Sequence, residues 1–149
     1  MNDQPLIDKV LKYIKGCNTA DVELMVSTFA EDVTAYFIDR PPVHGSGSLA
    51  QFWKMVHDVT KARWSVDHAI VAGQEVVIEW SQVWTPPGGS TEEFSRGVDW
   101  FIFVNGQIAA IHQYYRPRNL GPDQMYELQG FPYGDRGYPG RDDFDSHLP

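Results

Sequence analysis

The chain has 149 residues, of which 42% are hydrophobic and 21% charged, and this is the size and composition of one globular domain. A formal net charge of −8 argues against binding to nucleic acid or to an anionic membrane surface. The single Cys17 excludes an internal disulfide framework, and no apolar run or basic leader points to a membrane or to export, so we expect a cytoplasmic protein.

Helical patterns come first along the chain. The first has apolar residues at helical spacing between Pro5 and Gly16, and the second covers residues 22–29. Residues 33–38 then have the β-branched and aromatic composition of a strand, which two consecutive prolines end. A third helix is predicted over residues 49–59, after a loop rich in Gly and Ser.

Four longer strand patterns follow, separated by turns rich in Gly, Pro and Asn. They cover residues 64–72, 75–85, 94–104 and 107–115, in hairpin order. Helices gathered ahead of strands favour an α+β fold rather than alternating βαβ units. We therefore predict a cone-shaped, curved antiparallel β-sheet wrapped by three N-terminal helices.

The predicted domain covers residues 1–116, and a different composition begins after it. Residues 117–149 hold five of the ten prolines together with five glycines and five aromatic residues. Such a segment does not form regular structure, but its aromatic side chains need a surface to cover them. We expect this C-terminal extension to pack on the domain or on a partner subunit.

Asp99 is the most informative candidate for chemistry. It interrupts residues 98–104, a run that is otherwise apolar on both faces, and it shares its face with Phe101 and Phe103. Burial raises the pKa of a carboxyl group, and a protonated carboxyl can donate a hydrogen bond to a developing oxyanion. The alternative is a structural carboxylate bonded to Arg96 or to a backbone amide.

Tyr13 lies among apolar residues of the first helix, either as an ordinary core tyrosine or as a second donor to the same oxygen. It stands sixteen residues before Phe29-Ala30-Glu31-Asp32-Val33-Thr34. The loop Pro41-Pro42-Val43-His44-Gly45 and the segment Val98-Asp99-Trp100-Phe101-Ile102-Phe103 follow in order. Over about residues 5–116, these motifs resemble the ketosteroid isomerase branch of the nuclear transport factor 2-like superfamily, with its SnoaL-like polyketide cyclases and scytalone-type dehydratases.

The resemblance implies a cystatin-like, NTF2-like cone whose open end binds a flat apolar molecule. It also implies that Tyr13 and Asp99 form the oxyanion-stabilising pair. It supplies no base, because the family's proton-shuttling aspartate falls where this chain has Tyr36 or Phe37.

Two residues are candidates to replace the missing base. Asp39 lies two residues beyond Phe37, although a loop carboxylate there can also simply pair with Arg40. His68 resembles the acid/base histidine of scytalone-type dehydratases, although a strand histidine can also be a hydrogen-bonded core residue.

The predicted function is that of an isomerase, cyclase or dehydratase acting on a flat hydrophobic carbonyl compound, such as a steroid, a polyketide or a terpenoid. The alternative is an NTF2-like module that binds a ligand or a protein without turnover. We expect no metal and no cofactor, and we expect a homodimer formed through the exposed face of the sheet. The residues expected to contact the substrate are Tyr36, Phe37, Trp53, Trp80, Trp84, Phe101, His112 and Tyr114.

Overall fold

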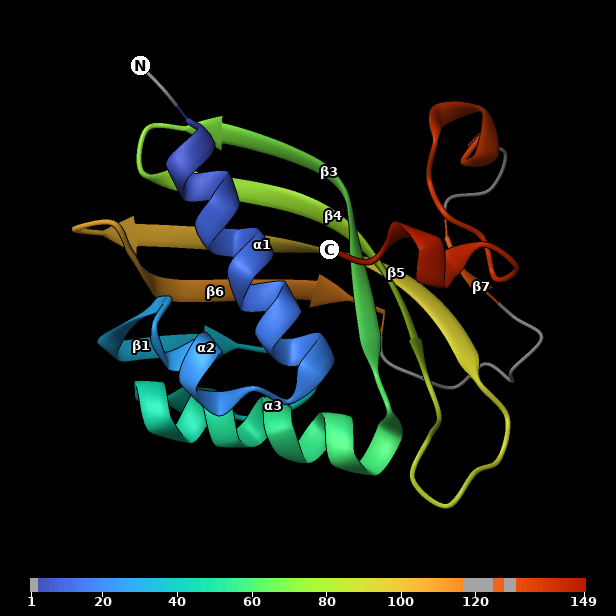
Figure 1. Cartoon of the computed structure of the whole chain (residues 1–149), viewed down its shortest axis with the longest axis horizontal. Helices are drawn as coiled ribbons and strands as arrows, with labels where there is room; N and C mark the ends of the chain where they lie inside the picture. The colour runs from blue at the N-terminus through green and yellow to red at the C-terminus, as the bar shows by residue number, and fades with distance from the viewer. Residues whose placement is uncertain (1–2, 117–124, 128–130) are drawn as a thin grey trace.

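The structure is a computed structural model that describes residues 3–116, 125–127 and 131–149 (Figure 1). The α+β fold predicted from the sequence is confirmed, with helices in the first part of the chain and long strands after them. The helices are α1 (Gln4–Thr19), α2 (Val22–Val26) and α3 (Ser46–Thr60). The strands are β1 (Phe29–Tyr36), β2 (Val43–His44), β3 (Arg63–Ala72), β4 (Glu75–Trp84), β5 (Glu93–Val104), β6 (Gln107–Tyr115) and β7 (Met125–Tyr126), and 3-10 turns cover Gly134–Arg136 and Phe144–His147.

The strands form one sheet in the order β2-β1-β6-β5-β4-β3, and β7 pairs with β5. Strands β3 to β6 are antiparallel neighbours in hairpin order, as predicted. One strand pair departs from the predicted antiparallel sheet, because β1 pairs in parallel with β6. Parallel pairing needs a long connection between the two strands, and here α3 and four strands supply it.

Two predicted boundaries also differ from the structure. Gly16 does not end α1, which continues to Thr19; a Cβ at Gly16 would lie 2.6 Å from Cγ of Met25, so the glycine lets α2 approach α1 closely. The second helix ends at Val26, and Phe29 is the first residue of β1 rather than part of the helix. The helical spacing of residues 22–29 therefore extends beyond the helix itself.

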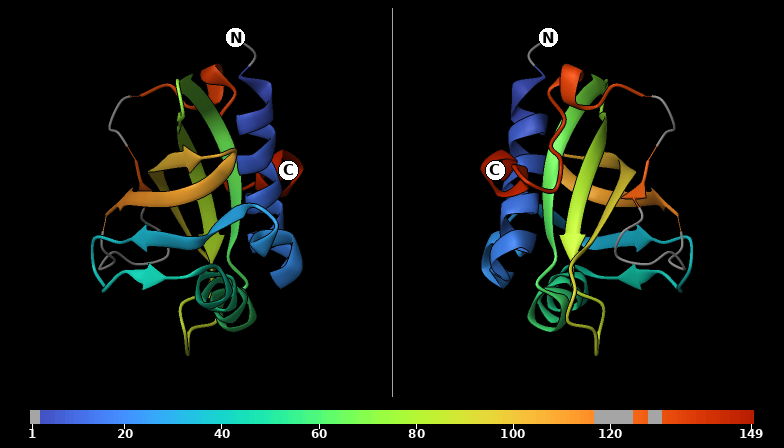
Figure 2. Two further views of the ribbon diagram at one scale, coloured as in Figure 1. Left: turned by 90° about the vertical axis from the view of Figure 1, so that its left-hand side faces the viewer. Right: turned by 90° about the vertical axis from the view of Figure 1, so that its right-hand side faces the viewer.

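The inner face of the sheet packs against the helices, and Figure 2 shows the strands bending around them. Alternate residues of β4 and β5 face this core, among them Ile78, Trp80, Phe101 and Phe103. None of the helices in the described segments is long and apolar enough to cross a membrane. The core thus occupies the space between helices and sheet, and the same space holds the candidate site.

The C-terminal extension covers part of the opposite, outer face of the sheet. Phe144 is buried against Val83 and Phe94, which project outward from β4 and β5. The guanidinium of Arg96 donates to the Pro139 carbonyl oxygen at 3.1 Å and lies 3.8 Å from the centre of the Tyr133 ring. Of the extension predicted over residues 117–149, residues 117–124 and 128–130 lie outside the described residues.

Candidate functional site

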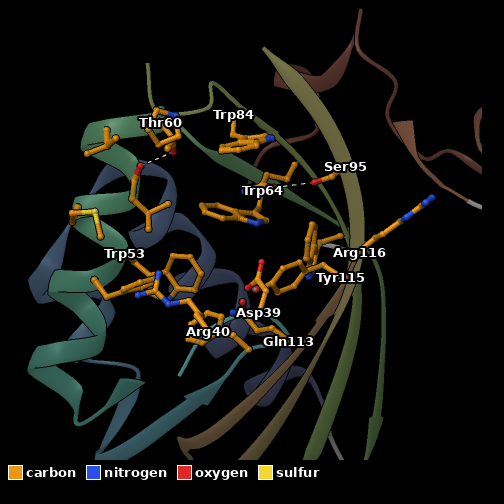
Figure 3. A pocket seen from close by; sticks show the side chains of 18 residues that line it. Asp39, Arg40, Trp53, Thr60, Trp64, Trp84, Ser95, Gln113, Tyr115 and Arg116 are labelled. Atoms are coloured by element: carbon orange, nitrogen blue, oxygen red, sulfur yellow. Dashed lines mark hydrogen bonds between the residues drawn. The ribbon is translucent and has the colours of Figure 1, made fainter. Parts of the chain in front are cut away.

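A cavity of about 340 Å³ lies between α3 and the inner face of β4, β5 and β6 (Figure 3). Its volume is in the range of pockets that hold small ligands. Aromatic rings make up much of its wall, namely Phe37, Phe52, Trp53, Trp64, Trp80 and Trp84. Flat apolar walls of this kind favour a flat apolar ligand.

Polar side chains reach this pocket from the sheet, from the loop after β1 and from the end of α3. The hydroxyl of Tyr115 donates a hydrogen bond to the carboxylate of Asp39. The Ser95 hydroxyl donates to Oε1 of Gln82 at 2.9 Å. The guanidinium of Arg40 lies 4.2 Å from the centre of the Phe52 ring, as a cation–π contact.

Asp99 lies on the inner face of β5, with only 4% of its surface exposed. Its Oδ1 accepts a hydrogen bond of 2.8 Å from the indole N–H of Trp80. Burial raises the pKa of Asp99 to about 7, and the Trp80 hydrogen bond opposes that rise. The predicted alternative partner, Arg96, faces the other side of the sheet, where it binds Ser81 and Glu127.

Tyr13 is 1% exposed and projects from α1 into the same core. Its ring makes an edge contact with Phe101, with 5.7 Å between the ring centres. Burial, and then the proximity of Cys17 and of Asp99, hold the pKa of the Tyr13 hydroxyl well above its usual range, while the Trp53 indole N–H lowers it. The carboxyl group of Asp99 is therefore close enough for its charge to raise the pKa of Tyr13.

The structure does not bring Tyr13 and Asp99 to the surface of the pocket. Neither residue is among those that line the cavity, and the described residues show no hydrogen bond between them. Two wall residues adjoin the pair instead. Trp80 lines the pocket and donates a hydrogen bond to Asp99. Trp53 also lines the pocket, and it lowers the pKa of Tyr13.

Four of the eight residues predicted to contact the substrate line the cavity. They are Phe37, Trp53, Trp80 and Trp84, and the candidate base Asp39 lies with them. Phe101 is fully buried beneath the pocket, in contact with Tyr13. The predicted alternative pairing of Asp39 with Arg40 is not what the structure has, because Asp39 accepts from Tyr115.

The other predicted site residues lie outside the cavity. Tyr36, His112 and Tyr114 line a shallow depression on the outer side of the sheet, because alternation along β6 turns Ile111 and Gln113 inward. His68 is exposed on β3, where its neighbour Ala69 packs against the core. It is therefore neither the pocket histidine nor the core histidine that the sequence suggested.

Several wall residues were not predicted from the sequence, among them Gln82, Gln113 and Tyr115. The period of two along β6 is the signal that finds Gln113 and Tyr115, because they share a face with the apolar Ile111. On β4 the same period places Gln82 on the face of Trp80 and Trp84. Within residues 3–116, 125–127 and 131–149, no three His, Cys, Asp or Glu side chains gather as a set that could hold a metal ion.

The chain is similar to a known domain family and to several solved structures. The family described as SnoaL-like domain matches residues 10–111. No curated protein matches the chain. Among solved structures, a protein of unknown function with a cystatin-like fold from Methylobium petroleophilum PM1 is 24% identical, with a TM-score of 0.70 and coverage of 94% of each chain. Because that coverage reaches beyond residue 116, its likeness includes part of the C-terminal extension.

Two further structures resemble the chain over most of its length. A candidate polyketide cyclase from Xanthomonas campestris pv. campestris is 21% identical, with a TM-score of 0.70, over 78% of this chain and 93% of its own. A protein from Mycobacterium tuberculosis in complex with estradiol-17beta-hemisuccinate is 15% identical, with a TM-score of 0.65, over 75% of this chain and 94% of its own. At these identities the likeness concerns the fold.

Proposed function

The chain belongs to the SnoaL-like domain family, and on this premise we propose that it is an enzyme that moves a proton on a flat, hydrophobic carbonyl compound. The observation that carries the proposal is a buried carboxyl group, Asp99, whose pKa of about 7 leaves it largely protonated in slightly acidic solution. Trp80 links this acid to an aromatic pocket large enough for a small ligand. A neutral acid in such a position can donate a hydrogen bond to an oxygen that gains negative charge.

In the proposed step, a carboxylate in the pocket removes a proton from the carbon next to the carbonyl group. Asp39 is the candidate, because it is the carboxylate on the cavity wall. The C–H electron pair forms a carbon–carbon double bond, and the carbonyl π pair moves to the oxygen. Tyr13 and the protonated Asp99 donate to that oxygen, and return of the proton to a different carbon completes an isomerisation.

This step requires the carbonyl oxygen to reach past the wall residues Trp53 and Trp80, which adjoin Tyr13 and Asp99. The test is deuterium exchange into 2-tetralone in D₂O, followed by proton NMR. Wild-type protein should accelerate exchange, and Tyr13→Phe and Asp99→Asn should each reduce that acceleration by about 100-fold. Asp32→Asn, an exposed carboxyl on β1, is the matched control and should exchange like wild type.

A second function is favoured by the same geometry. Neither Tyr13 nor Asp99 lines the pocket, so the domain can hold an aromatic molecule without placing it against the acid. A binding module would take up 2-tetralone in saturating amounts and leave its exchange rate at the value without protein. Binding without acceleration would therefore replace the enzyme proposal by this one.

We also propose that two copies associate through the part of the outer face that the described extension does not cover. Tyr36, Trp100 and Tyr114 are exposed there on β1, β5 and β6, and Tyr36 and Trp100 flank His112 in the sheet register. A cluster of large exposed rings is typical of protein interfaces. Light scattering after gel filtration should give the mass of a dimer, and Trp100→Glu should give a monomer; a monomeric wild type would contradict the proposal.

A further inference from the structure

The end of the β4–β5 hairpin beside the pocket is covered on both of its faces. On the inner face, Gln82, Trp84 and Ser95 line the aromatic cavity (Figure 3). On the outer face, Val83 and Phe94 alternate with these residues along the two strands and stand opposite each other in the register. The pocket and the C-terminal extension therefore lie on opposite sides of the same two strand ends.

Phe144 is the residue of the extension that covers this outer face. It is 2% exposed, and its ring centre lies 5.8 Å from that of Phe94. Val83 completes the cluster, and the partly buried Leu148 packs against it. A buried aromatic ring removes a large apolar area from water, so this contact holds the turn Phe144–His147 directly behind the pocket wall.

An arginine connects the same turn to the loop of the hairpin. Arg63 donates from Nε to Asp145 at 2.9 Å and from Nη1 to Glu92 at 3.2 Å. Glu92 belongs to the loop between β4 and β5, and Pro87 of that loop lines the cavity. The extension therefore contacts the loop at the pocket as well as the strands.

The hairpin end has less support from the rest of the sheet than the middle of the strands has. β6 ends opposite Gly97, so residues 93–96 of β5 extend beyond it, and β7 of the extension pairs with this segment. On the inner side, the Thr85 N–H donates to the Thr60 carbonyl oxygen at the end of α3, at 2.8 Å. Because segments with fewer contacts open more easily, packing on the outer face should influence where the inner face lies.

We propose that Phe144 is a positioning residue for the ligand pocket, which holds the Trp84 wall in place from behind the sheet. This role rests on the proposed function, because the ligand is the one proposed for that pocket. With the Phe144 ring in place, the hairpin end stays close to the end of α3. Without it, the hairpin end moves outward and Trp84 moves with it. Ligand binding and docking of the turn then stabilise each other by the same factor, because coupling between two binding equilibria is reciprocal.

Equilibrium dialysis with 2-tetralone tests this role, at a temperature where circular dichroism shows each variant folded. Phe144→Ala should bind 2-tetralone at least about five-fold more weakly than wild type. Phe144→Leu keeps a large apolar side chain and should retain most of the affinity. Val10→Ala is the matched control, because it removes buried atoms from the α1 core away from the cavity wall and should lower stability without changing affinity. Wild-type affinity in Phe144→Ala would overturn the proposal.

A second measurement needs no ligand. In a proton–nitrogen NMR spectrum, the indole resonance of Trp84 should shift in Phe144→Ala, whereas that of Trp100, farther along β5 on the outer face, should stay in place. An unmoved Trp84 resonance would contradict the proposed role of Phe144. If 2-tetralone binds in the expected order but its deuterium exchange is not accelerated, the catalytic proposal fails and the role of Phe144 stands.

Discussion

The indole N–H of Trp80 donates to the buried carboxyl of Asp99 across the neighbouring strands β4 and β5, with 2.8 Å between the two atoms. Trp80 is the diagonal neighbour of Asp99, because Ile78 stands directly opposite it in the register. The same tryptophan lines the aromatic cavity. The Trp80 side chain therefore connects the pocket wall to the buried Asp99. A substitution at either residue should change the environment of the other.

Replacing Asp99 with Asn should make the protein more stable at neutral pH. The raised pKa of Asp99 means that the folded state keeps a proton that the unfolded state gives up above about pH 4. The stability that this proton contributes is complete below pH 4 and is lost as the pH rises through 7. Asp99→Asn has no proton to lose, so its advantage over wild type should grow to as much as about 4 kcal/mol by pH 8.

Urea unfolding of both proteins between pH 4 and pH 8 measures this difference. The free energies of unfolding of the two proteins should be nearly equal at pH 4 and should differ increasingly toward pH 8. Asp32→Asn, on the exposed side of β1, controls for the change from carboxyl to amide. A difference between Asp99→Asn and wild type that stays constant across the range would show that Asp99 does not titrate near neutrality in the folded protein.

Removing the Trp80 donor should raise the pKa of Asp99 further. Burial raises the pKa of Asp99, and the hydrogen bond from Trp80 lowers it. Trp80→Phe removes the hydrogen bond, so only the effect of burial is left. The carboxyl carbon of Asp99, followed by NMR, should titrate above pH 7 in the variant. Trp100→Phe is the control, because the Trp100 indole donates to Glu75 on the outer face at 3.0 Å and should leave the Asp99 titration where it is.

Much of this arrangement is predictable from local patterns. The period of two places Asp99, Phe101 and Phe103 on one buried face, and burial alone predicts the direction of the pKa shift. The partner of Asp99 is not predictable in this way. Arg96 is closer in sequence, but its odd spacing from Asp99 turns it to the outer face, and Trp80 reaches the carboxyl only through the β4–β5 register.

The pocket wall is predictable only in part, for a similar reason. Tyr36 and His112 looked like wall residues because they are aromatic and lie on the correct strands, but the parallel pairing of β1 with β6 places them together on the outer side. Parallel pairing between distant strands leaves no local signature in the sequence. Gln113 does line the pocket and has the right parity on β6, but a carboxamide on a strand carries no signal of its own for a pocket.

A side chain at Gly97 should push the Trp80 ring out of place. A Cβ there would lie 2.4 Å from Cζ2 of Trp80 and 2.8 Å from the Tyr114 carbonyl oxygen, and backbone cannot move as a flexible side chain can. Gly97→Ala should therefore lower the free energy of unfolding by about 1–3 kcal/mol, measured in urea. Gly47→Ala, in α3 with open space around it, is the control and should be neutral or slightly stabilising.

The same variant tests the link between Trp80 and the pocket. Displacing the ring changes the cavity wall, so Gly97→Ala should also weaken the binding of 2-tetralone, measured by equilibrium dialysis, whereas Gly47→Ala should bind it like wild type. Equal affinity of wild type and Gly97→Ala for 2-tetralone would mean that the Trp80 ring does not shape the binding site.

Phe144 should hold the C-terminal extension onto the sheet. It is 2% exposed, with its ring centre 5.8 Å from that of Phe94, and it forms a small cluster with Val83 away from the main core. Phe144→Ala removes the largest apolar contact of that cluster, so the free energy of unfolding should fall by about 3 kcal/mol. Asp142→Ala, exposed two residues earlier, is the control and should change stability little.

Limited proteolysis of the same variant distinguishes a loosened extension from a weakened core. The extension is also held by Arg96, through the Pro139 carbonyl and the Tyr133 ring, and by the Tyr138 hydroxyl, which donates to Glu79 at 2.5 Å. If Phe144 anchors the C-terminal extension, cleavage of Phe144→Ala should begin close to position 144 while the domain stays intact. Cleavage that begins in β4 or β5 would instead show that the cluster stabilises the sheet itself, because those strands carry its partners Val83 and Phe94.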